Sequence, residues 1–269
     1  MKFQRLFFLF TIFILLKITP LSAQERFTHI VFDTLLQQNV RGGMVYYPAF
    51  RNEKFENYLQ ELATAKPEKW ERSEQIAFWI NAYNAAVISE VLKHPGLRMV
   101  SGLPYFFQDS VVIAQQKLTI DSVLKTKLRA FKEPLVYFGV NSGAIGFPKL
   151  ENRAFKGQTV VKELQKNARA FLKSEENLLL DVPANTVWIS KLFLKQEDDF
   201  KSEKKSVLNF LVEYAPPVIA GYLAVHKNDV KIEYLDFNER INGKIEEPAT
   251  ASIKVYEKVK KQKKKKANK

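Results

Sequence analysis

One segment constrains the fold of this chain more than any other. The run "AFWINAYNAAVI", residues 77–88, is apolar at almost every position. Its helical pattern begins at the N-cap candidate Ser73 and must end near His94, because Pro95 and Gly96 cannot continue a helix. At 100° per residue, apolar side chains cover nearly the whole circumference. We therefore expect a buried helix with other elements packed around it.

Two asparagines, Asn81 and Asn84, interrupt this apolar helix. A buried amide without a partner costs about 1–3 kcal/mol, so each side chain needs hydrogen bonds. The asparagines can bond to the backbone of other segments and fasten loops to the core. They can also line a wet pocket, and the sequence leaves both interpretations open.

The other periodicities predict helices and short strands without regular β-α-β alternation, which is typical of an α+β fold. We expect a helical N-terminal third packed on a small, mainly antiparallel sheet with interspersed helices. The expected helices cover residues 27–40, 48–65, 120–131, 159–173 and 207–215, and the expected strands lie within residues 111–120, 134–141, 178–193 and 230–237.

The N-terminus has the layout of a secretory signal peptide. Lys2 and Arg5 precede an apolar run over residues 6–16, and small residues lead to Ala23. A retained membrane anchor is the alternative, but the run is much shorter than the roughly 20 residues that span a bilayer. We expect cleavage after Ala23 and export to the periplasm or the extracellular space.

Charge and cysteine content define the rest of the domain organisation. The chain has no cysteine and a net charge of +13. Nine lysines fall within residues 252–269, so the basicity is concentrated in a tail that we expect to be disordered. The nearly neutral residues 24–251 are expected to form a single α+β domain held together by its core alone.

The lysine-rich tail has two interpretations. It is either a solvated end or an arm that binds an anionic membrane or another polyanion. Tyr256 is the only aromatic residue among the lysines, so base stacking and sequence-specific nucleic-acid binding are not expected.

The loop "YFGVNSGAIGFPKL", residues 137–150, contains the one candidate nucleophile, Ser142. A serine hydroxyl needs a base within about 3 Å that removes its proton. The three histidines, His29, His94 and His226, are expected at the surface, so no catalytic triad is visible. Lys191 is the remaining candidate base, and it can reach Ser142 only if the fold brings the two segments together.

Four motifs in the right order resemble the domain of unknown function 547 family. They are "FWINAYNAAVI", "VNSGAIGFPKL", "ISKLFLKQEDDF" and "YLDFNERIN". Family members usually have a histidine where this chain has Tyr137, a cysteine at Ser142 and a second cysteine at Phe147. Many also carry Glu-His at residues 124–125 and Asp-Trp at residues 238–239. The resemblance thus implies a kept scaffold whose reactive side chains have been replaced.

These replacements favour a non-catalytic binding or structural protein of the cell envelope with a degenerate polar site. The partner is expected to be a small molecule, a peptide or an envelope component. The alternatives are a hydrolase or amide-bond-processing enzyme that uses Ser142, and a polyanion binder that uses the tail. No metal site or cofactor is expected. The expected ligand-binding residues are Trp79, Asn81, Tyr83, Asn84, Asn141, Ser142, Ser190, Asp199 and Asn242. Five of them are expected to line a groove, namely Trp79, Asn81, Asn84, Asn141 and Ser142.

Overall fold

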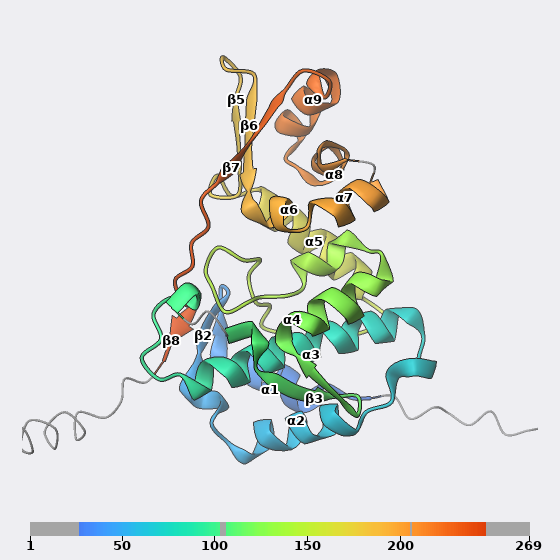
Figure 1. Cartoon of the computed structure of the whole chain (residues 1–269), viewed down its shortest axis with the longest axis vertical. Helices are drawn as coiled ribbons and strands as arrows, with labels where there is room; N and C mark the ends of the chain where they lie inside the picture. The colour runs from blue at the N-terminus through green and yellow to red at the C-terminus, as the bar shows by residue number, and fades with distance from the viewer. Residues whose placement is uncertain (1–26, 103–105, 205, 246–269) are drawn as a thin grey trace, which may run out of the picture.

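The computed structural model describes residues 27–102, 106–204 and 206–245 (Figure 1). The expected signal peptide and the lysine-rich tail lie outside these residues. Among the described residues, no helix is both long enough and apolar enough to cross a membrane.

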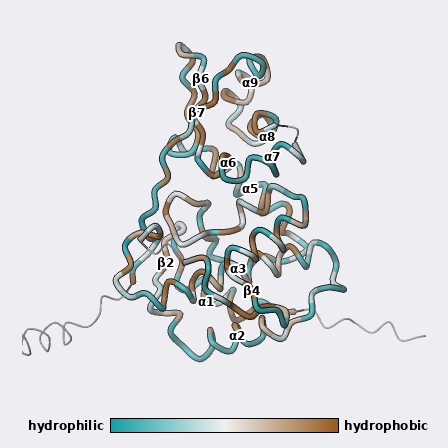
Figure 2. Tube along the Cα trace, in the orientation of Figure 1, coloured by the Kyte–Doolittle hydropathy of each residue, from teal (hydrophilic) through white to brown (hydrophobic). Residues whose placement is uncertain are grey.

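Three helices form the N-terminal part, as the sequence predicts. They are α1 (Ile30–Asn39), α2 (Glu53–Thr64) and α3 (Arg72–Lys93). The Asn52 side chain caps α2 by accepting a hydrogen bond from the amide of Phe55 at 3.0 Å. Much of α2 is hydrophilic (Figure 2), because this helix packs only one face on the core, through Phe55, Tyr58 and Leu62. By contrast, nearly every side chain of α3 from Ile76 to Val91 is buried.

A small sheet joins the two ends of the described chain. Strands β1 (Val40–Arg41) and β2 (Met44–Tyr46) pair antiparallel, and β8 (Gly243–Lys244) adds to β2 in parallel. A Cβ atom on Gly243 would lie 2.0 Å from the carbonyl oxygen of Val45, so the close approach of these strands requires a glycine.

The middle of the chain begins with the expected hairpin and helix. Strands β3 (Ser110–Ile113) and β4 (Gln116–Thr119) form an antiparallel hairpin. Ala114 and Gln115 make its two-residue turn with positive φ. The helical segment that follows changes its hydrogen-bond pattern along its length, through α4 (Ile120–Ser122), a π-helical stretch η5 (Val123–Leu128) and a 3₁₀ turn η6 (Arg129–Phe131).

The strand expected over residues 134–141 is wrong. The segment starts as a 3₁₀ helix, η7 (Pro134–Phe138), whose five residues are all buried. Pro134 supplies a φ that suits a helical start, and the Glu133 carboxylate accepts a hydrogen bond from the Leu135 amide at 3.4 Å. A short apolar run that is buried on all sides shows no polar positions, so its sequence pattern does not distinguish a strand from a helix. The prediction of a strand failed for this reason.

The C-terminal part contains the remaining sheet and its helices. Helix α5 (Val160–Leu172) precedes the hairpin of β5 (Leu178–Asp181) and β6 (Thr186–Ser190), and β7 (Lys231–Leu235) pairs with β6 in parallel. The helices between β6 and β7 are α6 (Lys191–Lys195), α7 (Glu197–Lys204), α8 (Val207–Tyr214) and α9 (Pro217–His226). Figure 1 shows this sheet and α9 at the end of the molecule away from α1 and α2.

The predicted α+β class is confirmed, and the strands of the described residues are divided among three small sheets instead of one. Buried apolar side chains form a cluster that runs from the N-terminal helices to α8. Around Phe138 of η7, the rings of Phe193, Phe200 and Phe210 lie with centroids 5.3 to 6.4 Å away. These ring contacts fasten α6, α7 and α8 to the middle of the molecule, and so fix the position of α7 beside η7.

Candidate functional site

The two asparagines of α3 fasten loops to the core. The Asn81 side chain donates to the carbonyl of Phe155 and accepts from the Phe155 amide, both at 2.9 Å. Asn84 donates to the carbonyl of Gly139 and accepts from the amide of Asn141, also at 2.9 Å. The interpretation that these amides bond to the backbone of other segments is confirmed.

Asn141 and Asn242 extend this network around the loop that contains Ser142. Asn141 donates to the carbonyl of Pro148 at 2.8 Å, and its side-chain oxygen accepts from the amide of Gly143 at 2.8 Å. Asn242 donates to the same oxygen of Asn141 at 2.9 Å, and Tyr47 donates its hydroxyl hydrogen to Asn242. The fold therefore brings together three predicted site residues, Asn84, Asn141 and Asn242, as a framework for the loop.

Ser142 lies inside this framework with only 2% of its surface exposed. Its hydroxyl is the one buried side-chain nitrogen or oxygen atom of the described residues that has no hydrogen-bond partner. Lys191, the candidate base, instead donates to Asp236 at 2.6 Å, at the surface. A proton acceptor beside Ser142 is thus absent from the described part of the chain.

The other predicted site residues serve capping or packing roles. Ser190 ends β6 and caps α6, accepting a hydrogen bond from the Leu192 amide at 3.2 Å. Lys191 is consequently the first residue of a helix and not part of the strand. Tyr83 is buried, which raises the pKa of its hydroxyl, and Trp79 is buried with the ammonium of Lys127 5.4 Å from its ring.

The groove expected from five residues of the sequence is not open at the surface. Each of these side chains is at most 5% exposed, and a ligand-binding role for them stays a prediction. They are Trp79, Asn81, Asn84, Asn141 and Ser142.

His29 is partly exposed, but its ring is more enclosed than the expected surface position implies. Its ring packs against Phe27 and Phe78, and Nδ1 lies 2.7 Å from the Tyr58 hydroxyl. Burial among these rings lowers the pKa of His29 to about 3. His94 and His226 are partly exposed and lie beside Glu90 and Asp229. No described histidine is therefore placed to act on Ser142.

A cavity of about 280 Å³ lies between the η6–η7 segment and α7. On its wall, Tyr137 of η7 donates its hydroxyl hydrogen to Asp199 of α7. Arg129 donates to the other carboxylate oxygen of Asp199 at 2.6 Å. Burial and the hydrogen bond to Asp199 together raise the pKa of Tyr137, so the phenol stays protonated and is a donor, not a base.

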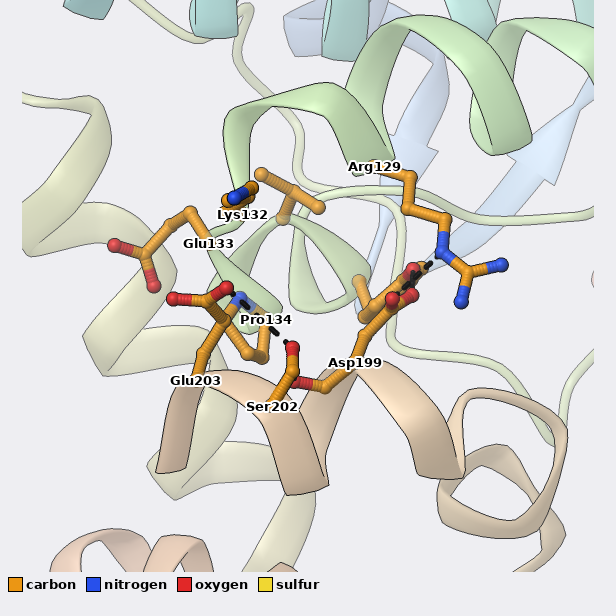
Figure 3. Close-up of a pocket in the computed structure, with 9 residues that line it drawn as sticks. Arg129, Lys132, Glu133, Pro134, Asp199, Ser202 and Glu203 are labelled. Carbon is orange, nitrogen blue, oxygen red and sulfur yellow. Dashed lines mark hydrogen bonds and ion pairs between the residues drawn. The ribbon is translucent and has the colours of Figure 1, made fainter. Parts of the chain in front are cut away.

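The rest of the cavity carries charges of both signs over an apolar base. Figure 3 shows the carboxylates of Glu133 and Glu203 on the side away from the Arg129–Asp199 pair. Lys132, held in the left-handed region with φ of 51°, and Ser202 complete the polar lining. Pro134 and Val136 supply the apolar surface.

Sequence reasoning found only Asp199 of this cavity. The sequence marks Tyr137 only through the resemblance, which implies a histidine at this position in family members. Arg129, Lys132 and Glu203 carry no sequence signal, because exposed charges of this kind occur throughout the chain. Only the packing of α7 against η7 unites these residues.

The described residues hold no cluster of three or more histidine, cysteine, aspartate or glutamate side chains that could bind a metal ion. Asp198, which precedes Asp199, is largely exposed, and its carboxylate lies 3.9 Å from the guanidinium of Arg129.

Comparison with known proteins identifies one family. The model of the family described as "Protein of unknown function, DUF547" matches residues 67–172, which include α3, η7 and the loop of Ser142. The matched range contains two of the four motifs, "FWINAYNAAVI" and "VNSGAIGFPKL", and supports the resemblance over that part of the chain. No curated protein and no solved structure matched the chain.

Proposed function

We propose that this chain, which is similar to the DUF547 family over residues 67–172, is an exported, non-catalytic binding domain, and that its ligand site is the cavity beside Tyr137 and Asp199. One observation carries the proposal. Tyr137, at a position where the resemblance implies a histidine in the family, donates its hydroxyl hydrogen to Asp199 at the cavity wall. The Tyr137–Asp199 hydrogen bond supplies a fixed polar group, while a histidine, which could transfer a proton near neutral pH, does not occupy this position.

The state of Ser142 supports a non-catalytic role. Its hydroxyl is buried and has no partner among the described residues, so nothing there activates it as a nucleophile. The Tyr137 phenol cannot replace the missing base, because its raised pKa keeps it protonated at neutral pH. A binding site needs only shape and fixed donors and acceptors, which the cavity has.

Binding and catalysis are separated by two assays on the purified protein. A thermal-shift screen against amino acids, short peptides, sugars and sugar phosphates should find ligands that raise the melting temperature, and Tyr137→Phe and Asp199→Asn should weaken the shift. A panel of peptides and esters should show no turnover that depends on Ser142. Hydrolysis lost in Ser142→Ala, or labelling of Ser142 by a fluorophosphonate, would overturn the proposal.

Export is the second part of the proposal, supported by the basic, apolar and small-residue order of residues 1–23. The mature protein should begin at Gln24 and leave the cytoplasm. N-terminal sequencing of the protein from fractionated cells tests this, and a cytoplasmic protein that keeps residues 1–23 would refute it.

The lysine tail favours a second candidate function, attachment to a polyanion or an anionic membrane. Residues 252–269 contain nine lysines and one acidic residue, Glu257. Such attraction weakens as salt is added. Co-sedimentation with vesicles of anionic lipid should therefore fall with salt and disappear when the tail is deleted, whereas equal sedimentation of the shortened chain would exclude this function.

A further inference from the structure

The ligand class follows from the charges that the cavity leaves unpaired. Arg129 and Asp199 neutralise each other, and the Tyr137 hydroxyl is also committed to Asp199. Three lining charges have no ion pair within the described part of the chain, namely Lys132, Glu133 and Glu203. The cavity therefore offers two carboxylates and one ammonium to whatever enters it.

The two carboxylates are poised to accept hydrogen bonds from a cationic group. Among the described residues, the Glu133 carboxylate accepts only a long hydrogen bond from the Leu135 amide, and the Glu203 carboxylate only a long one from the Ser202 hydroxyl, both at 3.4 Å. Their remaining lone pairs face solvent or ligand. Both lie on the same side of the cavity in Figure 3. A protonated amine placed there would gain charge-assisted hydrogen bonds.

Lys132 supplies the complementary charge. It occupies the turn between η6 and η7, where its positive φ fixes the direction of the backbone. Its ammonium is the only lining cation that is not already paired with a carboxylate among the described residues. An anionic group of the ligand would meet it, and Pro134 and Val136 would contact the apolar part between the two charged ends.

From these observations we infer that the cavity binds a small zwitterion, a free amino acid or dipeptide with one protonated amine and one carboxylate. The amine lies against Glu133 and Glu203, and the carboxylate against Lys132. The volume of about 280 Å³ limits the ligand to this size. This inference rests on the proposed function, since it names the ligand class of the same site.

Calorimetric titration with dialanine and its blocked forms tests the inference. Dialanine should bind, while N-acetylation and carboxyl amidation should each weaken the affinity about tenfold, which is the effect of one lost charge-assisted hydrogen bond. Glu203→Gln should reduce the penalty of acetylation, and Lys132→Gln should reduce the penalty of amidation. Glu176→Gln and Lys173→Gln change exposed charges outside the cavity lining and should leave binding unchanged.

The outcomes distinguish a failure of the inferred ligand class from a failure of the proposed binding function. If a neutral sugar or another non-zwitterion bound in a Tyr137-dependent manner while dialanine and single amino acids did not, the ligand class would be wrong and the binding site would stand. If no compound of the panel bound, both would fall. Equal affinity for blocked and free dialanine would also overturn the inference that the ligand is a zwitterion.

Discussion

The Asn84 side chain holds both sides of the loop that leads to Ser142, since it donates to the carbonyl of Gly139 and accepts from the amide of Asn141. One buried residue of α3 therefore fixes the backbone one residue before and one residue after Val140.

Asn84→Ala should destabilise the protein by about 3 kcal/mol, because it leaves a buried carbonyl and a buried amide without partners. Urea unfolding at pH 7 measures this. Asn81→Ala makes the same test at the Phe155 loop and should cost a similar amount. A loss below about 1 kcal/mol in both variants would show that water replaces the amides.

Ser142→Ala should stabilise the protein by about 1 kcal/mol, because it removes a buried hydroxyl that has no partner among the described residues. Ser190→Ala is the matched control and should destabilise by about 1 kcal/mol, since its hydroxyl caps α6. Unfolding free energies of both variants are compared with the parent. Destabilisation of equal size in the two variants would mean that the Ser142 hydroxyl is bonded.

The stability of the protein should fall below pH 6.5 through His29. Its pKa is about 3 in the folded state and about 6.5 in the unfolded chain, so acid protonates the unfolded state first. The stabilisation is fully present above pH 6.5 and is lost as the pH falls toward 3. At pH 4.5 the loss should be about 2–3 kcal/mol.

His29→Gln isolates this effect, because the variant keeps all other titrating groups. The difference in unfolding free energy between parent and variant should shrink from pH 7 to pH 4.5. A difference that stays constant over this range would show that His29 titrates normally in the folded protein.

Two glycines should respond in opposite ways to the same substitution. Gly243→Ala should cost more than about 2 kcal/mol, because its Cβ would meet the Val45 carbonyl at 2.0 Å where β8 joins β2. Gly221→Ala on α9 should stabilise by about 0.5–1 kcal/mol, since no atom lies within 4 Å and alanine favours the helix. Thermal unfolding of the two variants tests the pair. Equal shifts would contradict the register of β2 with β8.

Tyr137→Phe and Asp199→Ala test the cavity wall in a double-mutant cycle. Removing the hydroxyl of Tyr137 should cost about 1–2 kcal/mol. Asp199→Ala should cost more, because it leaves both this hydroxyl and Arg129 without their acceptor. The unfolding free energies should be non-additive by about 1 kcal/mol. Additive losses would mean that the two side chains do not interact in solution.

Much of the fold is predictable because burial imposes periodicity on the sequence. The apolar circumference of residues 76–91 predicts the central helix, and the Pro-Ala-Asn turn predicts the β5–β6 hairpin. The segment at residues 134–138 is not predictable in this way, because a short run buried on every side has no polar face to reveal its period. The partial enclosure of the His29 ring is equally hidden, since it depends on rings from α2 and α3.

The sequence by itself determined the α+β class, the buried asparagines and the resemblance to one family, because these depend on local pattern and on motif order. Only the tertiary structure decided that the asparagines bind backbone, that Ser142 has no partner in the described chain, and that Asp199 meets Tyr137 and Arg129. Asp199 lies 62 residues from Tyr137 along the chain. Contacts over such separations are set by how helices pack, and no local periodicity encodes which exposed charges that packing will bring together.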